Sequence, residues 1–341
     1  MKKQTITFVI PILLLAACNS RNEQPIRLQG TTQGTYYSII YYDDQHRNLQ
    51  PQVDSLLHCF DLTANLWIDS STIRRINSNE DSLIGETFRD LLLKSIEINH
   101  YTQGAFNCKI GSLVNLYGFG FKNRESISDQ QLSDILTSIR QDSTTVTPTA
   151  ERGVYILHKL PSIEYDFNAI AQGYTSDLIA KLFDQLGLDS YLIDVGGEVI
   201  AKGHKPNGDR WTVGIERPAK TKDSEQQIET AIELNDMSVV TSGNYRKYYE
   251  ENGVRYSHTI DPTTGYPVDH TLLSVSVVSK QSWYADAMAT AFMVMGLEKS
   301  LQFIEQHPED ADIQAAFFIY NDNGEYKTHA TPQFRQIIKK K

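Results

Sequence analysis

The chain has 341 residues, of which 40% are hydrophobic and 22% are charged, so it is long enough to bury a sizeable core. Its formal net charge is −10 at pH 7. Nucleic-acid phosphates are bound by basic surfaces, so this balance argues against DNA or RNA as a partner.

The N-terminus carries the features of an export signal. Lys2 and Lys3 precede the apolar stretch TITFVIPILLLAA, which is too short to span a bilayer and ends in small residues before Cys18. LAAC resembles the bacterial lipobox, in which the cysteine becomes the lipidated first residue of the mature protein. A plain signal peptide with an incidental Cys18 is the alternative. We expect a lipoprotein signal peptide over 1–17, a polar tether over 18–27, and a lipid anchor that holds a soluble domain at a membrane.

The next part of the chain gives both strand and helix signals. GTYYSIIYYD is rich in β-forming residues and predicts a strand. Apolar residues at helical spacing predict helices over 51–66 and 87–102, the second followed by a stop at Gly104. Ser128 and Gln131 form a capping-box pattern that predicts a further helix start, and GVYILHK predicts a strand.

The segment AIAQGYTSDLIAKLFDQLG predicts a long helix that stops at Gly187. One helical stripe holds Ile170, Tyr174, Leu178, Leu182 and Leu186.

Strand signals dominate after this helix, in SYLIDVG, EVIAKG, WTVGIE, TAIELN, SVVTSG and LLSVSVVSK. The segment YADAMATAFMVMG then predicts a helix, residues 297–306 a second helix, and AAFFIYND a strand. Residues 219–227 read as a surface loop, and the final KKK as a solvated tail. Because helices and strands mix without regular βαβ alternation, we predict an α+β fold and not a doubly wound sheet.

Two cysteines follow Cys18 in the chain. In an oxidising compartment Cys59 and Cys108 could pair, but no CxxC spacing supports a cysteine zinc site. Cys59 lies in the amphipathic run VDSLLHCFDLTANL and is expected to be a small buried apolar residue. Two free, buried thiols are the favoured interpretation.

Two segments place oxygen-bearing side chains close together. Asp286 and Thr290 are four residues apart on a predicted helix, so both project from one face and offer oxygens of the kind that Mg²⁺ prefers. Taken alone, the pair more often indicates a structural role, with a buried aspartate that caps nearby amides and a threonine bonded to its own helix. Thr241 and Ser242 follow a predicted strand and fit either a ligand-facing turn or a helix cap.

Three further sites have both a functional and a structural interpretation. Asp166 is expected at the end of a strand and before a predicted helix, where it can bind a ligand or cap the helix. The paired glycines in DVGGEVIAKG allow close approach to phosphate or a tight turn, and no GxGxxG opens a helix. Asp261 could orient His258 as a general base, although a lone histidine on a strand is more often structural.

Five segments together resemble one family. GTTQGTYYSI, GAFNCKIGSLVNLYGFG, DFNAIAQGYTSDLIAKLFDQLGLDSYLIDVGGEVIAKG, VVTSGNYRKYYEENGVRYSHTIDPTTGYPV and ADAMATAFMVMG occur in the order and spacing of the ApbE-type FAD:protein FMN transferases, here in a lipoprotein member. The resemblance implies one flavin transferase domain over 28–336 and a basic tail over 337–341. The implied fold is α+β and two-lobed, with helices packed on a mixed sheet and the active site between the lobes.

The resemblance also implies an activity. This family moves FMN from FAD to a Ser or Thr hydroxyl of a target flavoprotein, forms a phosphoester, releases AMP and needs Mg²⁺. The implied acceptors are subunits of membrane redox complexes or exported electron-transfer proteins. The implied location is the periplasmic side of a bacterial envelope membrane, with the inner membrane favoured over the outer. An FAD pyrophosphatase and a non-catalytic FAD-binding lipoprotein are the alternatives.

By the same resemblance, the metal lies between Asp286, Thr290 and the backbone carbonyl of Ala169, and His258 is the base with Asp261 orienting it. Some members carry a further aspartate where this chain has Ala289, which implies fewer carboxylates here. The implied FAD contacts are Gln33, Trp67, Ala105, Phe106, Asn107, Asp166, Gln172 and Ile260.

Three of these FAD contacts depart from the common family pattern. Gln33 stands where many members have Met, Asn107 where Asp is usual, and Gln172 where Lys or Glu is common. A neutral amide in place of a charged group changes the local electrostatics and keeps the capacity for hydrogen bonds.

Overall fold

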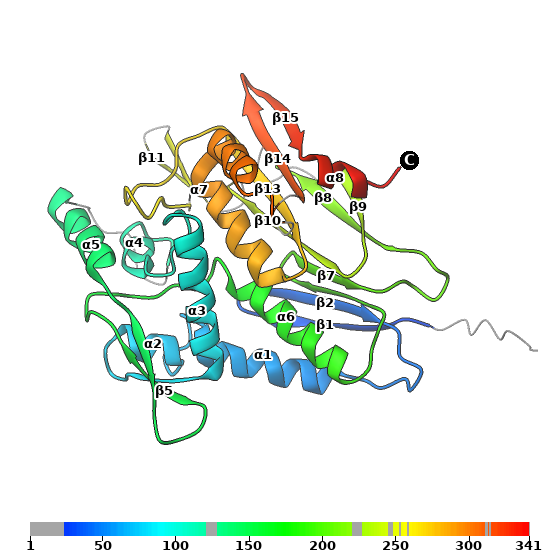
Figure 1. The fold of residues 1–341 in the computed structure, drawn as a ribbon, viewed down its shortest axis with the longest axis horizontal. Helices are drawn as coiled ribbons and strands as arrows, with labels where there is room; N and C mark the ends of the chain where they lie inside the picture. The colour runs from blue at the N-terminus through cyan, green and yellow to red at the C-terminus, as the bar shows by residue number, and fades with distance from the viewer. Residues whose placement is uncertain are drawn as a thin grey trace, which may run out of the picture.

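An eight-stranded sheet organises the protein (Figure 1). The structure, a computed structural model, describes residues 24–120, 128–219, 227–244, 248–251, 254–257, 259–310, 313 and 315–340, with side chains for all but 248–251 and 254–257. The sheet order is β1-β2-β6-β7-β10-β13-β14-β15. Its strands are β1 (Ile26–Thr32), β2 (Thr35–Tyr41), β6 (Tyr191–Val195), β7 (Glu198–Lys202), β10 (Met237–Gly243), β13 (Leu272–Ser279), β14 (Ala315–Asp322) and β15 (Glu325–Ala330).

Three smaller sheets complete the strands. They are formed by β3 (Leu83–Gly85), β4 (Thr145–Pro148) and β5 (Val154–His158), by β8 (Trp211–Arg217) and β9 (Gln227–Leu234), and by β11 (Tyr248–Glu251) and β12 (Val254–Ser257). The α+β class is confirmed. The main sheet is antiparallel in every described ladder and not mixed, and tight turns join β1 to β2, β6 to β7 and β14 to β15.

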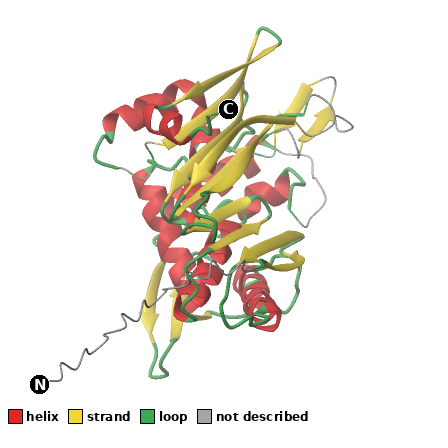
Figure 2. Ribbon diagram, turned by 90° about the vertical axis from the view of Figure 1, so that its right-hand side faces the viewer, coloured by secondary structure: helices red, strands yellow, loops and turns green. Residues whose placement is uncertain are grey.

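Helices α6 and α7 cover one face of the main sheet (Figure 1). Helix α6 contacts β6 and β7, and α7 contacts β10 and β13. Figure 2 shows a column of helices along one side of the strands. The helices are α1 (Gln50–Ala64), α2 (Thr72–Asn77), α3 (Glu86–Tyr101), α4 (Gly111–Leu116), α5 (Asp129–Gln141), α6 (Ala171–Gln185), α7 (Ser282–Gln306) and α8 (Pro332–Ile337).

Both faces of the central strands are buried. Ile200 packs toward α1 and α6, whereas its neighbours Val199 and Ala201 enter a separate core beneath the β8–β9 hairpin and α8. Phe318 and Phe317 divide in the same way between the helix side and the hairpin side. Because side chains alternate along a strand, burial of both faces requires the continuous apolar runs of these segments.

Several local predictions are confirmed. The Ser128 side chain accepts the Gln131 N–H while the Gln131 side chain returns to the Ser128 backbone, so the predicted capping box starts α5. Gly187 has a φ of 78° and follows Leu186, the C-cap residue of α6, as the predicted helix stop requires. Gly296, with φ 75° and ψ 173°, divides the run Ser282–Gln306, in agreement with the predicted second helix over 297–306.

The predicted burial of α6 and α1 needs correction. Ile179 and Phe183 are fully buried, while Leu178 and Leu182 of the predicted stripe are only half-buried, because α6 packs against α1, α7 and the sheet together. Cys59 was expected to be buried and is exposed. The buried positions of α1 are Val53, Leu57, Phe60 and Ala64, and Cys59 lies off that face. Cys108 is buried, and both thiols are free.

Ordered contacts extend beyond both ends of the predicted domain, residues 28–336. Ile26, placed in the predicted tether, pairs with Tyr41 in the sheet. In the predicted tail, Ile338 forms a bridge with Ile232 and the Lys339 N–H donates to the Ala231 carbonyl at 2.8 Å. Residues 220–226 of the predicted surface loop lie outside the described residues.

Candidate functional site

A cavity of about 650 Å³ lies where the helical part meets the sheet. Its walls come from segments far apart in the sequence, including the β1–β2 turn, the loops before α4 and α6, the β6–β7 turn, β8, β10 and α7. This agrees with the expected site between two parts of the fold. The predicted site residues that line it are Gln33, Trp67, Asn107, Asp166, Ala169, Gln172, Ile260, Asp286 and Thr290.

Helix α7 contributes the buried carboxylate of this cavity. Asp286 is 4% exposed, and its Oδ2 accepts the Gly173 N–H at 3.0 Å. Burial raises the pKa of the Asp286 carboxyl, the Gly173 bond opposes that rise, and the nearby Asp177 carboxylate adds to it. One turn further along, the Thr290 hydroxyl lies 3.5 Å from that of Ser242 at the end of β10.

The residues around Asp286 fit a hard divalent cation. Asp286, Thr290 and Ala169 all line the cavity and offer only oxygen ligands, the type that Mg²⁺ prefers. Within the described ranges, no three His, Cys, Asp or Glu side chains gather as a metal-binding group. A cation held by Asp286, Thr290 and Ala169 would have one carboxylate together with a hydroxyl and a carbonyl oxygen. Its charge would offset the cost of ionising Asp286 in a buried place.

Two loops that carry predicted FAD contacts are bonded together. The Asp166 N–H donates to the Cys108 carbonyl at 2.8 Å, and the Gly111 N–H donates to the Glu164 carbonyl at 3.0 Å. A Cβ on Gly111 would lie 2.7 Å from that carbonyl oxygen, so only glycine permits this approach. Asp166 lies in a loop and not at a strand end, and its Oδ1 accepts the Asn168 N–H at 2.8 Å.

Exposed aromatic rings line the cavity. Trp67 is 58% exposed and offers a flat face for stacking. Tyr36 is 49% exposed, and its hydroxyl donates to Asp194 Oδ2 at 3.2 Å. Asp194 also accepts the Gly197 N–H at 2.9 Å, which ties the β6–β7 turn to Tyr36. Gln33 takes a φ of 51° in the β1–β2 turn and donates to the Thr175 hydroxyl at 2.9 Å.

Tyr36, Asp194 and β8 residues 212–216 line the cavity without having been predicted as site residues. The paired glycines after Asp194 were the one local signal near them. The strand over 212–216 was predicted, but its position above the site depends on how the β8–β9 hairpin packs, which a sequence pattern does not contain.

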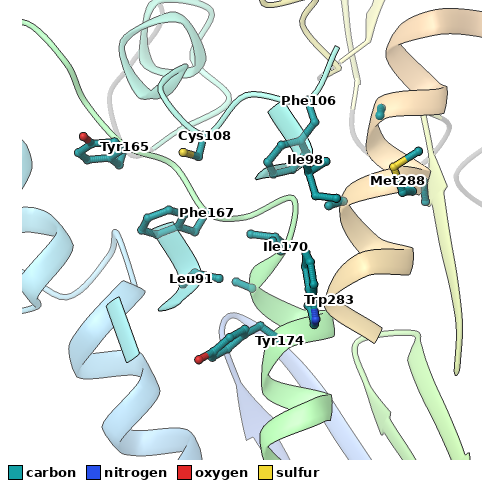
Figure 3. Close-up of a cluster of buried hydrophobic side chains, with 14 of the residues drawn as sticks. Leu91, Ile98, Phe106, Cys108, Tyr165, Phe167, Ile170, Tyr174, Trp283 and Met288 are labelled. Carbon is teal, nitrogen blue, oxygen red and sulfur yellow. The ribbon is translucent and has the colours of Figure 1, made fainter. Parts of the chain in front are cut away.

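Some predicted residues do not reach the cavity. Phe106 is 2% exposed and belongs to the core (Figure 3), and the neighbouring Ala105 packs against that core. Asp261 accepts the Thr263 N–H at 2.8 Å, while its carbonyl accepts the Gly265 N–H at 2.8 Å, so its contacts are those of a turn residue. His258 and Cys18 lie outside the described residues, so their predicted roles stay predictions.

Sequence comparison identifies full-length relatives. Residues 33–317 match the ApbE family. The FAD:protein FMN transferase of Haemophilus influenzae is 31% identical over 353 residues, which cover 99% of both chains. The protein of the same name from Vibrio cholerae is 32% identical over 338 residues, covering 96% of this chain and 97% of the relative.

Solved structures share the fold. The flavinyl transferase ApbE of Pseudomonas stutzeri, in its apo form, superposes with a TM-score of 0.78 at 30% identity, covering 92% of this chain and 97% of that one. The flavin transferase ApbE of Vibrio cholerae gives a TM-score of 0.77 at 30% identity, covering 92% and 99%. By sequence over nearly its whole length, and by fold, this chain belongs to the ApbE family.

Proposed function

We propose that this chain is an enzyme that transfers the FMN half of FAD to a hydroxyl group of an acceptor protein. The relatives named FAD:protein FMN transferase support the reaction class. The observation that carries the proposal is that the oxygen-bearing residues of α7 and the exposed ring of Trp67 line the same cavity. Such a cavity suits a dinucleotide whose ring stacks and whose pyrophosphate lies near a cation.

In the proposed reaction, a Ser or Thr oxygen of the acceptor bonds to the FMN phosphorus of FAD. The bond from that phosphorus to the bridging pyrophosphate oxygen breaks, and AMP leaves. The acceptor hydroxyl loses its proton to a base, the role that the sequence predicts for His258. No electron is transferred, and the FMN is left on the acceptor in a phosphoester.

The described side chains have binding and positioning roles in this proposal. Asp286, Thr290 and Ala169 would hold Mg²⁺, which when bound supplies charge neutralisation for the pyrophosphate. Asn107 and Asp166 line the cavity on two bonded loops and would meet polar groups of FAD. Trp67 would stack on a ring of the dinucleotide.

A direct test is to incubate the protein with FAD, Mg²⁺ and a candidate acceptor and to weigh the acceptor by mass spectrometry. We expect a mass gain equal to FMN with an equal amount of AMP released. Release of AMP without a mass gain would overturn transfer in favour of FAD hydrolysis. The absence of both would leave only an FAD-binding protein. Subunits of membrane redox complexes and exported electron-transfer proteins are the acceptors to test first.

Substitutions test the assigned roles. Asp286→Ala should abolish Mg²⁺-dependent turnover and keep the fold, because the cation site loses its carboxylate. Asp184→Ala is a matched control, since Asp184 lies outside the cavity and bonds Tyr191 and Lys202. Full activity of Asp286→Ala would overturn the cation assignment. His258→Ala should still bind FAD and lose transfer, whereas loss of folding would make the histidine structural.

We also propose that a lipid on Cys18 holds the protein at the periplasmic side of a bacterial envelope membrane, the inner one in preference to the outer. The LAAC pattern supports this proposal. Among the described residues, none of the helices combines the length and apolarity that a bilayer crossing requires. Cys18→Ser should move the protein from the membrane fraction to the soluble fraction, and continued membrane association of that variant would contradict the anchor.

A further inference from the structure

We propose that Asp177 on α6 is a positioning residue that holds the cation-binding end of α7 in register with the cavity. Asp177 does not line the cavity, so its action passes through α7. The inference rests on the proposed function in one respect, because that function gives Asp286 its place in a cation site.

Asp177 caps α7 from a neighbouring helix. Its Oδ1 accepts the Ser282 N–H at 3.0 Å, and its Oδ2 accepts the Trp283 N–H at 2.8 Å. The first N–H groups of a helix have no partner within that helix, and α7 receives no side-chain cap from its own N-cap residue, Gln281. A carboxylate at this end is also favoured by the helix dipole.

A second contact lies one turn away, toward the start of α6 and further along α7. The Gly173 N–H donates to Asp286 Oδ2 at 3.0 Å. Gly173 and Asp177 are four residues apart on α6, and Ser282 and Asp286 are four apart on α7. The two contacts are therefore separated by about one helical turn, roughly 5.4 Å. Two attachment points at this spacing fix both the rotation of α7 about its axis and its position along α6.

The helix backbones approach closely at these contacts. A Cβ on Gly173 would lie 2.4 Å from the Ser282 carbonyl oxygen and 2.8 Å from Asp286 Cβ. Figure 3 shows Trp283 projecting from α7 in the same cluster as Ile170 and Tyr174 of the α6 region. Because interiors are closely packed, a shift of α7 at this point would move Asp286 relative to the cavity.

The surroundings of Asp177 disfavour the ionised form of its carboxyl. Burial raises the pKa of its carboxyl to about 6, against the opposing effect of the Trp283 and Ser282 N–H bonds. It also lies near enough to raise the pKa of Asp286. The α7 N–H groups that donate to Asp177 offset this cost, so its carboxylate and the start of α7 hold each other in place.

The test measures cation binding without turnover. Mn²⁺ serves as the probe, and its dissociation constant is obtained by electron paramagnetic resonance in the absence of FAD and acceptor. For Asp177→Ala we expect the constant to rise about tenfold or more, the usual effect of losing a group that orients a metal ligand. Asp177→Asn keeps one acceptor oxygen and should give a smaller rise.

Asp90→Asn is the matched control. Asp90 accepts the Tyr174 hydroxyl at 2.8 Å, so this variant also removes a carboxylate contact to α6 but leaves the α6–α7 contacts in place. The thermal midpoint of every variant is measured beside the Mn²⁺ constant. A lower midpoint with unchanged Mn²⁺ affinity in Asp177→Ala, as in the control, would overturn the proposal. If Asp177→Ala does not fold, unchanged affinity in Asp177→Asn would overturn it in the same way.

The outcome separates this inference from the proposed function. If the wild type binds Mn²⁺ but transfers no FMN, the proposed function is contradicted. The positioning role is then still supported if Asp177→Ala binds Mn²⁺ more weakly than the wild type. Transfer by the wild type with no effect of Asp177 on Mn²⁺ would contradict the positioning role alone. A wild type that binds no Mn²⁺ would overturn both the cation site and the role of Asp177.

Discussion

Asp43 ties the loop between β2 and α1 to the rest of the fold. Its Oδ2 accepts both the backbone N–H of Arg47 at 2.9 Å and the Arg47 Nε–H at 2.8 Å. Arg47 also donates to the carbonyl of Leu186, at the end of α6, at 3.1 Å. The hydrogen bond from Arg47 is the main reason why the pKa of Asp43 falls to about 2.

This pair predicts a pH-dependent contribution to stability. The unfolded carboxyl has a pKa near 3.8 and the folded one a lower value, so the unfolded chain binds more protons between these values. The contribution is present above pH 4 and is lost as the pH falls toward 2. We expect Asp43→Asn to lower the free energy of unfolding by about 2 kcal/mol at pH 7, and the difference from wild type to shrink in acid.

Urea unfolding at pH 7, 4 and 2 measures this difference. Asp69→Asn is the control, because Asp69 pairs with Arg74 at 3.0 Å but its side chain is 94% exposed. Exposed ion pairs contribute little, so the control should change stability by less than about 1 kcal/mol. Equal losses in the two variants would contradict the role of the buried Asp43 carboxylate.

At the scale of the element, local sequence patterns predicted where helices begin and end, but they did not predict which helix faces are buried. The capping box of α5 and the break at Gly296 follow from side-chain and backbone properties of a few neighbouring residues. The buried face of α6 could not be derived in the same way, because it depends on three partners that are distant in sequence. Strand β1 was missed for a similar reason, since its pairing with β2 makes it a strand.

The α5 cap gives an element-scale prediction. Ser128→Ala should destabilise α5 by about 1 kcal/mol, because the Gln131 N–H loses its acceptor. Hydrogen exchange of the α5 amides should accelerate accordingly. Ser133→Ala, at an exposed position inside the same helix, should leave exchange unchanged or slow it, since alanine is the better helix former. Faster exchange in both variants would point to a general effect of losing serine.

At the scale of the molecule, the cavity is assembled from residues between Gln33 and Met293. The motif order assigned nine of the residues that line this cavity to the site. It did not identify Tyr36 or the β8 wall, whose positions are set by the packing of whole strands. It also assigned Phe106 to the site, whereas the Phe106 ring packs in the hydrophobic core.

A cavity built from the whole chain predicts that its ligand stabilises the whole chain. FAD at one hundred times its dissociation constant should add about 2.7 kcal/mol to the free energy of unfolding and raise the thermal midpoint. Trp67→Ala should reduce that rise, because stacking on the exposed ring is lost. Leu62→Ala changes an exposed apolar residue that does not line the cavity and should leave the rise intact. If FAD raises the thermal midpoint of Trp67→Ala as much as that of the wild type, the assignment of Trp67 to the FAD site is wrong.

The unequal burial of the two described cysteines has a practical consequence for spectroscopy. Burial raises the pKa of the Cys108 thiol to about 12, and the thiolate is the form that reacts with alkylating reagents. Cys59 is exposed on α1. A maleimide dye at neutral pH should therefore attach to Cys59 and spare Cys108, so the native sequence already offers a fluorophore site on the outer surface of a helix.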